Sequence, residues 1–253
     1  MSDNNLNQSN NRNNNGNQSP KKPGILMLLF PPECVGCGEL MPPAEGAETV
    51  FCPFCQAQWE AGRLRREDRN LVWEGPFRGL SSVVKYRSGM TNGVPERLIY
   101  RLKHKDERRV FDYAAREMTT AVKALLADLD VPTEAVLISY PPRRRKAIRK
   151  DGFDQAKRLA EALSRETGWP QRTLLARSNR GSREQKTLDA AARTANATKS
   201  YRLSADAKDL SGRTVILVDD LYTTGATLRA CTQLLIDAGA DGVILSTVGR
   251  TEK

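Results

Sequence analysis

This 253-residue chain contains one histidine, and aromatic residues make up only 6% of it. His104 lies in a basic stretch and is most simply a solvated helix residue. Because it is the single histidine, no catalytic mechanism that uses histidine can be built at any other position. No apolar run approaches the roughly 20 residues of a membrane span, so we expect no membrane insertion. The apolar run from Ile25 to Phe30 stops at Pro31 and is too short for a signal peptide. We therefore expect a cytoplasmic protein.

Positive charge is abundant: 40 Lys and Arg residues face 30 Asp and Glu, a formal net charge of +10. Such an excess favours polyanionic partners, namely nucleic acid, diphosphates or anionic lipid. It is densest between residues 143 and 150. The candidate nucleic-acid contacts there are Arg143, Arg144, Arg145, Lys146, Arg149 and Lys150. An equally good interpretation is a solvated loop or one that faces a diphosphate.

Four of the five cysteines form two C-x-x-C pairs, Cys34 with Cys37 and Cys52 with Cys55, about fourteen residues apart. This spacing is close to that of a structural Zn²⁺ ribbon, in which four thiolates fill a tetrahedral shell. The alternative, a pair of redox-active dithiols, lacks the surrounding βαβ pattern. A cytoplasmic setting argues against disulfides. Cys231 is most simply a small core residue.

Composition divides the chain into three parts. Residues 1–23 are rich in Asn and predict a disordered tail. Residues 24–66 hold the cysteines and predict a zinc-ribbon-like module, and residues 67–253 predict an α/β domain. In this last part we expect a hairpin at 71–86, helical segments at 95–129, 153–167 and 228–239, and strands at 135–140, 214–219 and 242–248. Alternating strands and helices indicate a doubly wound parallel sheet.

One stretch joins a buried strand to two carboxylates and a hydroxyl-rich loop. The apolar run from Val215 to Val218 precedes Asp219 and Asp220, which could accept hydrogen bonds from vicinal ribose hydroxyls or hold Mg²⁺. The loop that follows begins a helix, whose N–H groups suit a phosphate; it contains Thr223, Thr224, Gly225, Ala226 and Thr227. This segment resembles the 5-phosphoribosyl-1-diphosphate (PRPP) signature of type I phosphoribosyltransferases. The alternative is a degenerate loop kept only as architecture.

The four-cysteine module, the helical segment and the PRPP-type site together resemble the ComF family of competence-associated, phosphoribosyltransferase-like proteins. The stretch 149–156 is similar to the family's R-x-R-G-F-N-Q-A segment. The family's Q-x-x-L-x-x-x-x-R-x-x-N pattern, which implies a mobile hood over the substrate, is matched by Gln185, Leu188, Arg193 and Asn196. The resemblance implies a type I phosphoribosyltransferase-like fold and a role in handling single-stranded DNA with the competence machinery. Base stacking would then fall to Phe54, Trp59 and Trp73.

The chain departs from the family at three places. Ser139 and Tyr140 stand where the family has a V-P-V-P turn that helps to cradle diphosphate. Asp151 and Asp154 replace an arginine and an asparagine. Thr223 occupies the position of the aspartate that serves purine-salvage enzymes as general base.

Two hypotheses follow. In the first, a Mg²⁺-dependent PRPP-binding protein uses Asp219 and Asp220 as catalytic residues, and Ser139 and Tyr140 with nearby arginines hold the diphosphate. A phosphoribosyl group would pass to an acceptor that the sequence does not identify. In the second, a non-catalytic protein handles single-stranded DNA and uses the PRPP site as a sensor.

Overall fold

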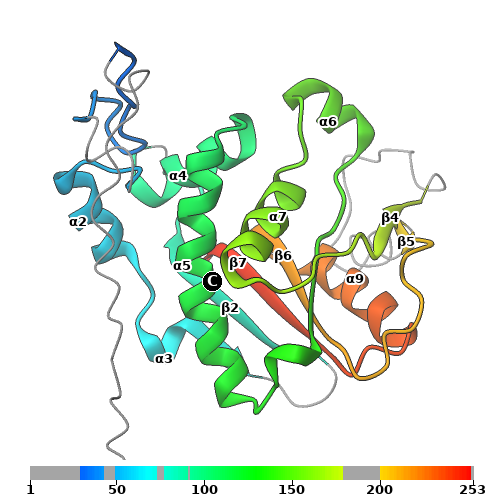
Figure 1. Ribbon diagram of the computed structural model, residues 1–253. Coiled ribbons are helices and arrows are strands. Elements are labelled where there is room, and N and C mark those ends of the chain that lie inside the picture. The colour runs from blue at the N-terminus through cyan, green and yellow to red at the C-terminus, as the bar shows by residue number, and fades with distance from the viewer. Residues whose placement is uncertain (1–28, 43–48, 73–76, 91, 179–199, 252–253) are drawn as a thin grey trace, which may run out of the picture.

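The computed structural model describes residues 29–42, 49–72, 77–90, 92–178 and 200–251. The expected tail, Trp73 and the four hood positions lie outside these ranges. The elements of Figure 1 used below are α2 (Pro53–Gly62), α3 (Arg66–Arg69), β1 (Asn70–Val72), β2 (Phe77–Tyr86), α4 (Val94–His104), α5 (Arg108–Asp128), the 3₁₀ helix η2 (Thr133–Ala135), β3 (Val136–Ser139), α6 (Arg145–Asp151), α7 (Gln155–Thr167), β4 (Leu175–Arg177), β5 (Tyr201–Leu203), β6 (Thr214–Tyr222), α9 (Ala226–Asp237) and β7 (Gly242–Thr251).

The main sheet has the strand order β1-β2-β7-β6-β3. Every neighbouring pair in it is parallel except β1 with β2, which pair antiparallel with Leu71 opposite Leu80. The expected hairpin is therefore present, and its second strand, β2, pairs in parallel with the central strand β7. The prediction of a doubly wound α/β fold preceded by a four-cysteine module is confirmed.

Helices cover both faces of this sheet. Helices α5 and α7 pack against each other and against one face, and α9 with the small β4-β5 sheet covers the other (Figure 1). Strand β6 contributes side chains to the cores on both faces, because alternate residues of a strand point to opposite faces of the sheet. Ile216 and Val218 belong to the core under α5 and α7, and Val215 and Leu217 to the core under α9; all four are fully buried.

The sheet extends beyond β3 by a short parallel bridge. Ile138 pairs with Gln171, donating its N–H to the Pro170 carbonyl and accepting from the N–H of Arg172. The carboxyl ends of β2, β7, β6 and β3 thus form one edge. In open α/β sheets, ligands bind at this edge.

The cysteine module packs directly on the α/β domain. Trp59 of α2 is fully buried, with ring centroids 5.6 Å from Phe51 and 5.9 Å from Tyr113 of α5. Its indole N–H donates to Glu117 over 3.2 Å, and Arg63 forms an ion pair with the same carboxylate. Trp59 therefore cannot stack on a base, and this prediction is wrong: the ring forms the core between module and domain.

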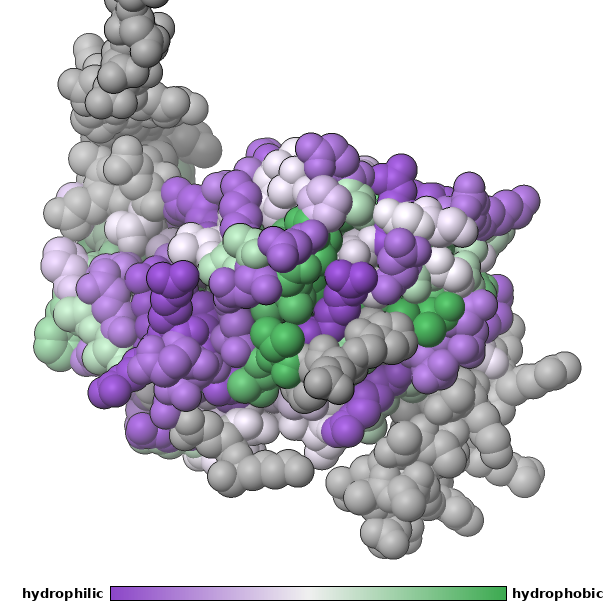
Figure 2. Space-filling model, turned by 90° about the horizontal axis from the view of Figure 1, so that it is seen from below, coloured by the Kyte–Doolittle hydropathy of each residue, from purple (hydrophilic) through white to green (hydrophobic). Residues whose placement is uncertain are grey.

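The surface reflects the charged composition. Seen from below, hydrophilic side chains cover most of the protein, and a narrow hydrophobic strip crosses the middle of this face (Figure 2). Within the described residues, none of the helices is both long and apolar enough to cross a membrane.

Candidate functional site

The two carboxylates at the end of β6 lie at the carboxyl edge of the sheet. Asp220 is 5% exposed, and its Oδ2 atom has no hydrogen-bond partner among the described residues. The nearest cation is Lys103 of α4, whose Nζ lies 3.7 Å from that oxygen. Asp219 is half-buried, and its Oδ1 accepts the backbone N–H of Asp220 over 2.9 Å.

The environment of Asp219 disfavours its charged form. Burial, reinforced by the negative charge of Asp220, raises the pKa of the Asp219 carboxyl well above its usual value of 3.8. Such a carboxylate gains most from a partner that supplies positive charge or donates hydrogen bonds. Ribose hydroxyls and a divalent cation both do so.

The loop after β6 has an open geometry at the start of α9. Thr223 and Thr224 are exposed, and Gly225 is the N-cap with a left-handed φ of 70°. A Cβ atom on Gly225 would lie 2.6 Å from the Tyr222 ring, so only glycine fits there. Because glycine has no side chain, the N-cap itself makes no bond to the first-turn N–H groups of α9; the N–H of Ala226 donates over a long 3.5 Å to the hydroxyl of Thr224 in the loop. That arrangement suits a phosphate.

Ser139 ends the neighbouring strand β3 and Tyr140 follows it, but both side chains are buried. The hydroxyl of Ser139 accepts the N–H of Leu174 over 3.3 Å, and the Tyr140 hydroxyl lies 3.1 Å from that of Thr173. Their polar side-chain atoms thus hold the strand to the segment after α7. Contact of this turn with a diphosphate stays a prediction, and it would have to use the backbone.

Arg177 is a candidate site residue that the sequence analysis missed. Its Nε donates to the Pro142 carbonyl over 3.0 Å, and its guanidinium lies 4.2 Å from the Tyr201 ring centroid. Burial lowers the pKa of the Arg177 guanidinium, so this cation is incompletely solvated and suited to pairing with an anion. No local motif marks it, because β4 and Pro142 meet only in the folded chain.

The members of the basic run differ in how exposed they are. Arg143 pairs with Asp151 over 2.9 Å, and its N–H donates to Asp154, which also accepts the N–H of Lys157 in the first turn of α7. The two acidic departures from the family pattern therefore fix the turn before α6 and the start of α7. The exposed members are Arg144, Arg145, Lys146, Arg149 and Lys150.

The four cysteines of the module converge. Their sulfur atoms all lie within 4.8 Å of one another, and those of Cys37 and Cys52 are 3.8 Å apart. A tetrahedral site with Zn–S bonds of ~2.3 Å has sulfur–sulfur edges of about 3.8 Å, so the cluster can hold such an ion. Burial alone would raise the pKa of the Cys34 thiol, but backbone N–H groups, first that of Cys52, lower it from 9.0 to about 7.

Three further residues considered in the sequence, Cys231, His104 and Phe54, differ in their exposure. Cys231 of α9 is fully buried, as expected for a small core residue. His104 is partly exposed; its ring centroid lies 4.6 Å from that of Tyr100 and its Nδ1 is 3.9 Å from Asp151. Phe54 is 71% exposed and is the one proposed stacking ring that the described residues leave accessible.

Comparison with known proteins gives matches along most of the chain. Residues 147–250 match a phosphoribosyl transferase domain. Competence protein ComFC of Bacillus subtilis is 26% identical over 217 residues, which cover 85% of this chain and 82% of that protein. DNA utilization protein YhgH of Escherichia coli is 26% identical over 235 residues, which cover 90% and 98%. Adenine phosphoribosyltransferase of Mycobacteroides abscessus is 46% identical over 52 residues, 19% of this chain and 29% of that enzyme.

The full-length matches agree with the architecture, in which a four-cysteine cluster precedes a parallel sheet that ends in an acidic pair and a glycine-capped helix. Over most of its length the chain is therefore similar to ComF-type competence and DNA utilization proteins, and its C-terminal part matches a phosphoribosyl transferase domain.

Proposed function

We propose that this chain binds PRPP at the carboxyl end of β6. The observation that carries the proposal is the sequence of groups along that edge: Asp219 and Asp220, then the open loop, then the start of α9 capped by Gly225. The carboxylates would accept hydrogen bonds from the ribose hydroxyls. Residues Thr223 to Thr227 would bind the 5-phosphate through hydroxyl and backbone N–H groups.

A divalent cation fits this site. The Oδ2 atom of Asp220 is buried without a hydrogen-bond partner among the described residues, and carboxylate oxygens are the donors that Mg²⁺ prefers. When bound, Mg²⁺ would neutralise diphosphate charge as the sugar–oxygen bond breaks. Asp219 and Asp220 would hold it together with the ribose.

Phosphoribosyl transfer is the reaction we propose for the site. The bond from C1 of the sugar to diphosphate would break, a bond from C1 to the acceptor would form, and the acceptor would lose a proton. Arg177 and the backbone at Ser139 and Tyr140 would stabilise the departing diphosphate. Electrostatic stabilisation of this kind is usually the largest single contribution to catalysis. Thr223 supplies no general base, so the acceptor is one that needs little assistance or brings its own base.

Calorimetric titration with PRPP tests the binding proposal directly. We expect saturable binding that strengthens when Mg²⁺ is present. Separate titrations with ribose 5-phosphate and with pyrophosphate should each give weaker binding, because each occupies only part of the site. Absence of binding to all three, with and without Mg²⁺, would contradict the proposal.

The four-cysteine cluster is proposed to hold one structural Zn²⁺. With four thiolates no coordination position is left open, so the metal would stabilise the module and take no part in catalysis. Its partners in packing are the buried rings of Phe51 and Trp59.

A second proposed function is binding of single-stranded DNA, which one relative's name, DNA utilization protein, suggests for this chain. The specific observation is the exposed cationic surface of α6, formed by Arg145, Lys146, Arg149 and Lys150. Replacing these four by Ala should reduce the slope of log K against log[salt] by about 3, since each phosphate contact on a single strand contributes roughly 0.7. An unchanged slope would mean that α6 faces solvent and makes no contact with the DNA phosphates. The competence machinery and a cytoplasmic location stay predictions.

A further inference from the structure

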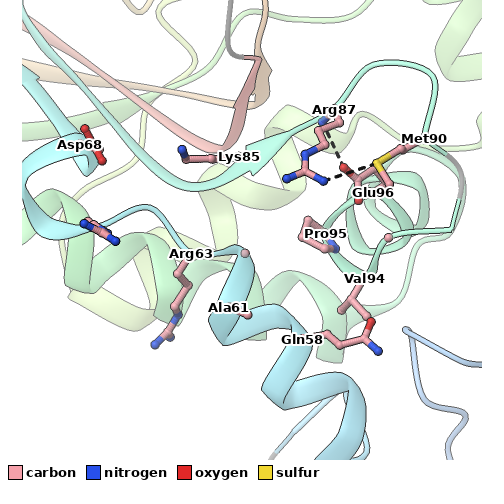
Figure 3. Close-up of a pocket in the computed structure, with 13 residues that line it drawn as sticks. Gln58, Ala61, Arg63, Asp68, Lys85, Arg87, Met90, Val94, Pro95 and Glu96 are labelled. Carbon is pink, nitrogen blue, oxygen red and sulfur yellow. Dashed lines mark hydrogen bonds between the residues drawn. The ribbon is translucent and has the colours of Figure 1, made fainter.

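A second cleft lies where the cysteine module meets the α/β domain. It has a volume of about 510 Å³ and lies between α2, α3, the end of β2 and the start of α4. Figure 3 shows Lys85 and Arg87 on one side of this cleft and α2, with Gln58 and Ala61, on the other. Its size is that of a small-molecule site.

The cleft has an excess of positive charge. Its lining includes Arg63, Arg65, Lys85 and Arg87 against two carboxylates, Asp68 and Glu96. Arg63 and Glu96 are engaged in interactions of their own. Arg63 points away from Lys85 and Arg87 and pairs with Glu117, and an oxygen of Glu96 accepts the backbone N–H of Arg87 over 3.0 Å.

The side chain of Arg87 has a weak partner. Its Nη1 lies 3.9 Å from the neutral sulfur of Met90, and no ion pair to Arg87 or Arg65 occurs among the described residues. Both arginines are exposed. They can therefore turn toward an anion without giving up a carboxylate.

The positive charge continues along the sheet edge. Lys85 pairs in register with Arg250 of β7, which pairs in register with Tyr222 of β6. The Nη1 atom of Arg250 is buried and has no hydrogen-bond partner among the described residues. Lys85 and Arg250 are thus neighbouring cations on adjacent strands beside the cleft.

We propose that this cleft is a second anion site, which takes the phosphate groups of a nucleotide-sized ligand or of a single-stranded nucleic acid. Arginine and lysine are the residues that recognise phosphate, by paired N–H donors and by charge respectively. The site is formed jointly by module and domain, and it is separate from both the acidic pair of β6 and the basic surface of α6. The inference does not depend on PRPP binding.

The test compares two double variants of equal charge. Arg65→Ala with Arg87→Ala removes the exposed arginines of the cleft. Arg66→Ala with Lys123→Ala removes two exposed cations outside it. Each protein, including the parent, is titrated with pyrophosphate and with a single-stranded oligothymidylate over a range of salt concentrations.

We expect the cleft variant to lose oligonucleotide affinity and the control to keep it. Two lost phosphate contacts reduce the salt slope by about 1.4, which corresponds to about 25-fold in affinity at roughly 0.1 M salt. Weaker binding of the oligonucleotide alone identifies a strand, and weaker binding of pyrophosphate identifies a free phosphate ligand. An unchanged unfolding temperature and unchanged tryptophan fluorescence of the cleft variant show that its fold is intact. Equal binding by the two variants, or no binding of either probe to the parent, overturns the proposal.

Discussion

The carboxyl edge of the sheet has two ends of opposite character. At β6 it is acidic, with Asp219 and Asp220 followed at once by the loop to α9. At β2 it is cationic, with Lys85 and Arg87 facing a module that comes from a different part of the chain. The first end is encoded by one continuous stretch of about a dozen residues. The second exists only because the cysteine module docks on α4 and α5, so the two ends should respond to different changes.

The largest effect should come from breaking the metal cluster. Cys34→Ser removes a thiolate from a closed tetrahedral shell, and structural Zn²⁺ contributes on the order of 10 kcal/mol to small modules. We expect loss of the bound metal, exposure of Trp59 with a red-shifted fluorescence, and loss of the cleft, while PRPP binding at β6 persists. Metal analysis and fluorescence measure this outcome.

Cys231→Ala is the matched control for that change. It also removes a buried thiol, but from α9, far along the chain from the cluster. Metal content should stay at about one ion per chain. If Cys34→Ser kept both its metal and a buried Trp59, the cluster would not be the basis of the module's fold.

At the other end, Gly225→Ala should disrupt the loop of Thr223 to Thr227, which is proposed to bind the 5-phosphate. Its φ of 70° costs an L-residue about 1 to 2 kcal/mol, and the added Cβ would also meet the Tyr222 ring. We expect PRPP affinity to fall at least about tenfold and the Tm to fall by several degrees. Differential scanning calorimetry and titration with PRPP give the two readings.

Gly212→Ala is the control that separates the effect of backbone strain from the effect of contact with the Tyr222 ring. Gly212 has the same φ of 70°, but no atom lies within 4 Å of an added Cβ. The control should lose stability from backbone strain and keep its PRPP affinity. Equal losses of affinity in the two variants would mean that the contact with Tyr222 has no role in the loop.

The stability of the acidic end should depend on pH. The pKa of Asp219 is raised in the folded chain, first by burial and then by Asp220, so the folded state holds this proton more tightly than the unfolded state. That contribution to stability is present below the usual pKa of 3.8 and is lost as the pH rises through the raised value. Asp219→Asn does not titrate, so its Tm should exceed that of the parent at neutral pH by a margin that shrinks toward pH 4. A Tm difference that grows on acidification would mean that folding lowers the pKa of Asp219 instead of raising it.

The smallest effect should come from Lys103, the cation 3.7 Å from Asp220. Its side chain is one third exposed, so we expect the ion pair to contribute less than about 1 kcal/mol. Lys103→Met should therefore change PRPP affinity by no more than about fivefold, with the larger change in the absence of Mg²⁺, and the neighbouring Lys105→Met should change nothing. Identical titration curves for the two variants would remove Lys103 from the site.

These differences explain which features could be predicted from the sequence. The strand predicted at 214–219, its acidic pair and the helix that follows come from local pattern, because buried parallel strands and helix starts have short-range signatures. The structure extends this strand to Tyr222 and begins the helix at Ala226. The four-cysteine cluster follows from spacing alone. The structure confirms that the strand, the helix and the cysteine cluster are present, whereas the binding roles of these residues stay predictions.

The features that were missed or wrong depend on tertiary packing. Trp59 is buried because α2 docks on α5, and the side chains of Ser139 and Tyr140 turn inward because the segment at 171–174 bonds to them. Arg177 of β4 reaches the carbonyl of Pro142 after β3, and Lys103 of α4 reaches Asp220. No sequence pattern records which distant segments will meet, so these contacts need the fold.

The most direct test of the account is calorimetric titration of the Asp219→Asn, Asp220→Asn double variant with PRPP and Mg²⁺. Asp206→Asn with Asp237→Asn, two exposed aspartates away from the site, is the matched control. We predict that the parent and the control bind PRPP and that the double variant does not, although it keeps its fold and its metal. Binding of PRPP by the double variant as tightly as by the parent would contradict the assignment of the β6 edge as the phosphoribosyl site.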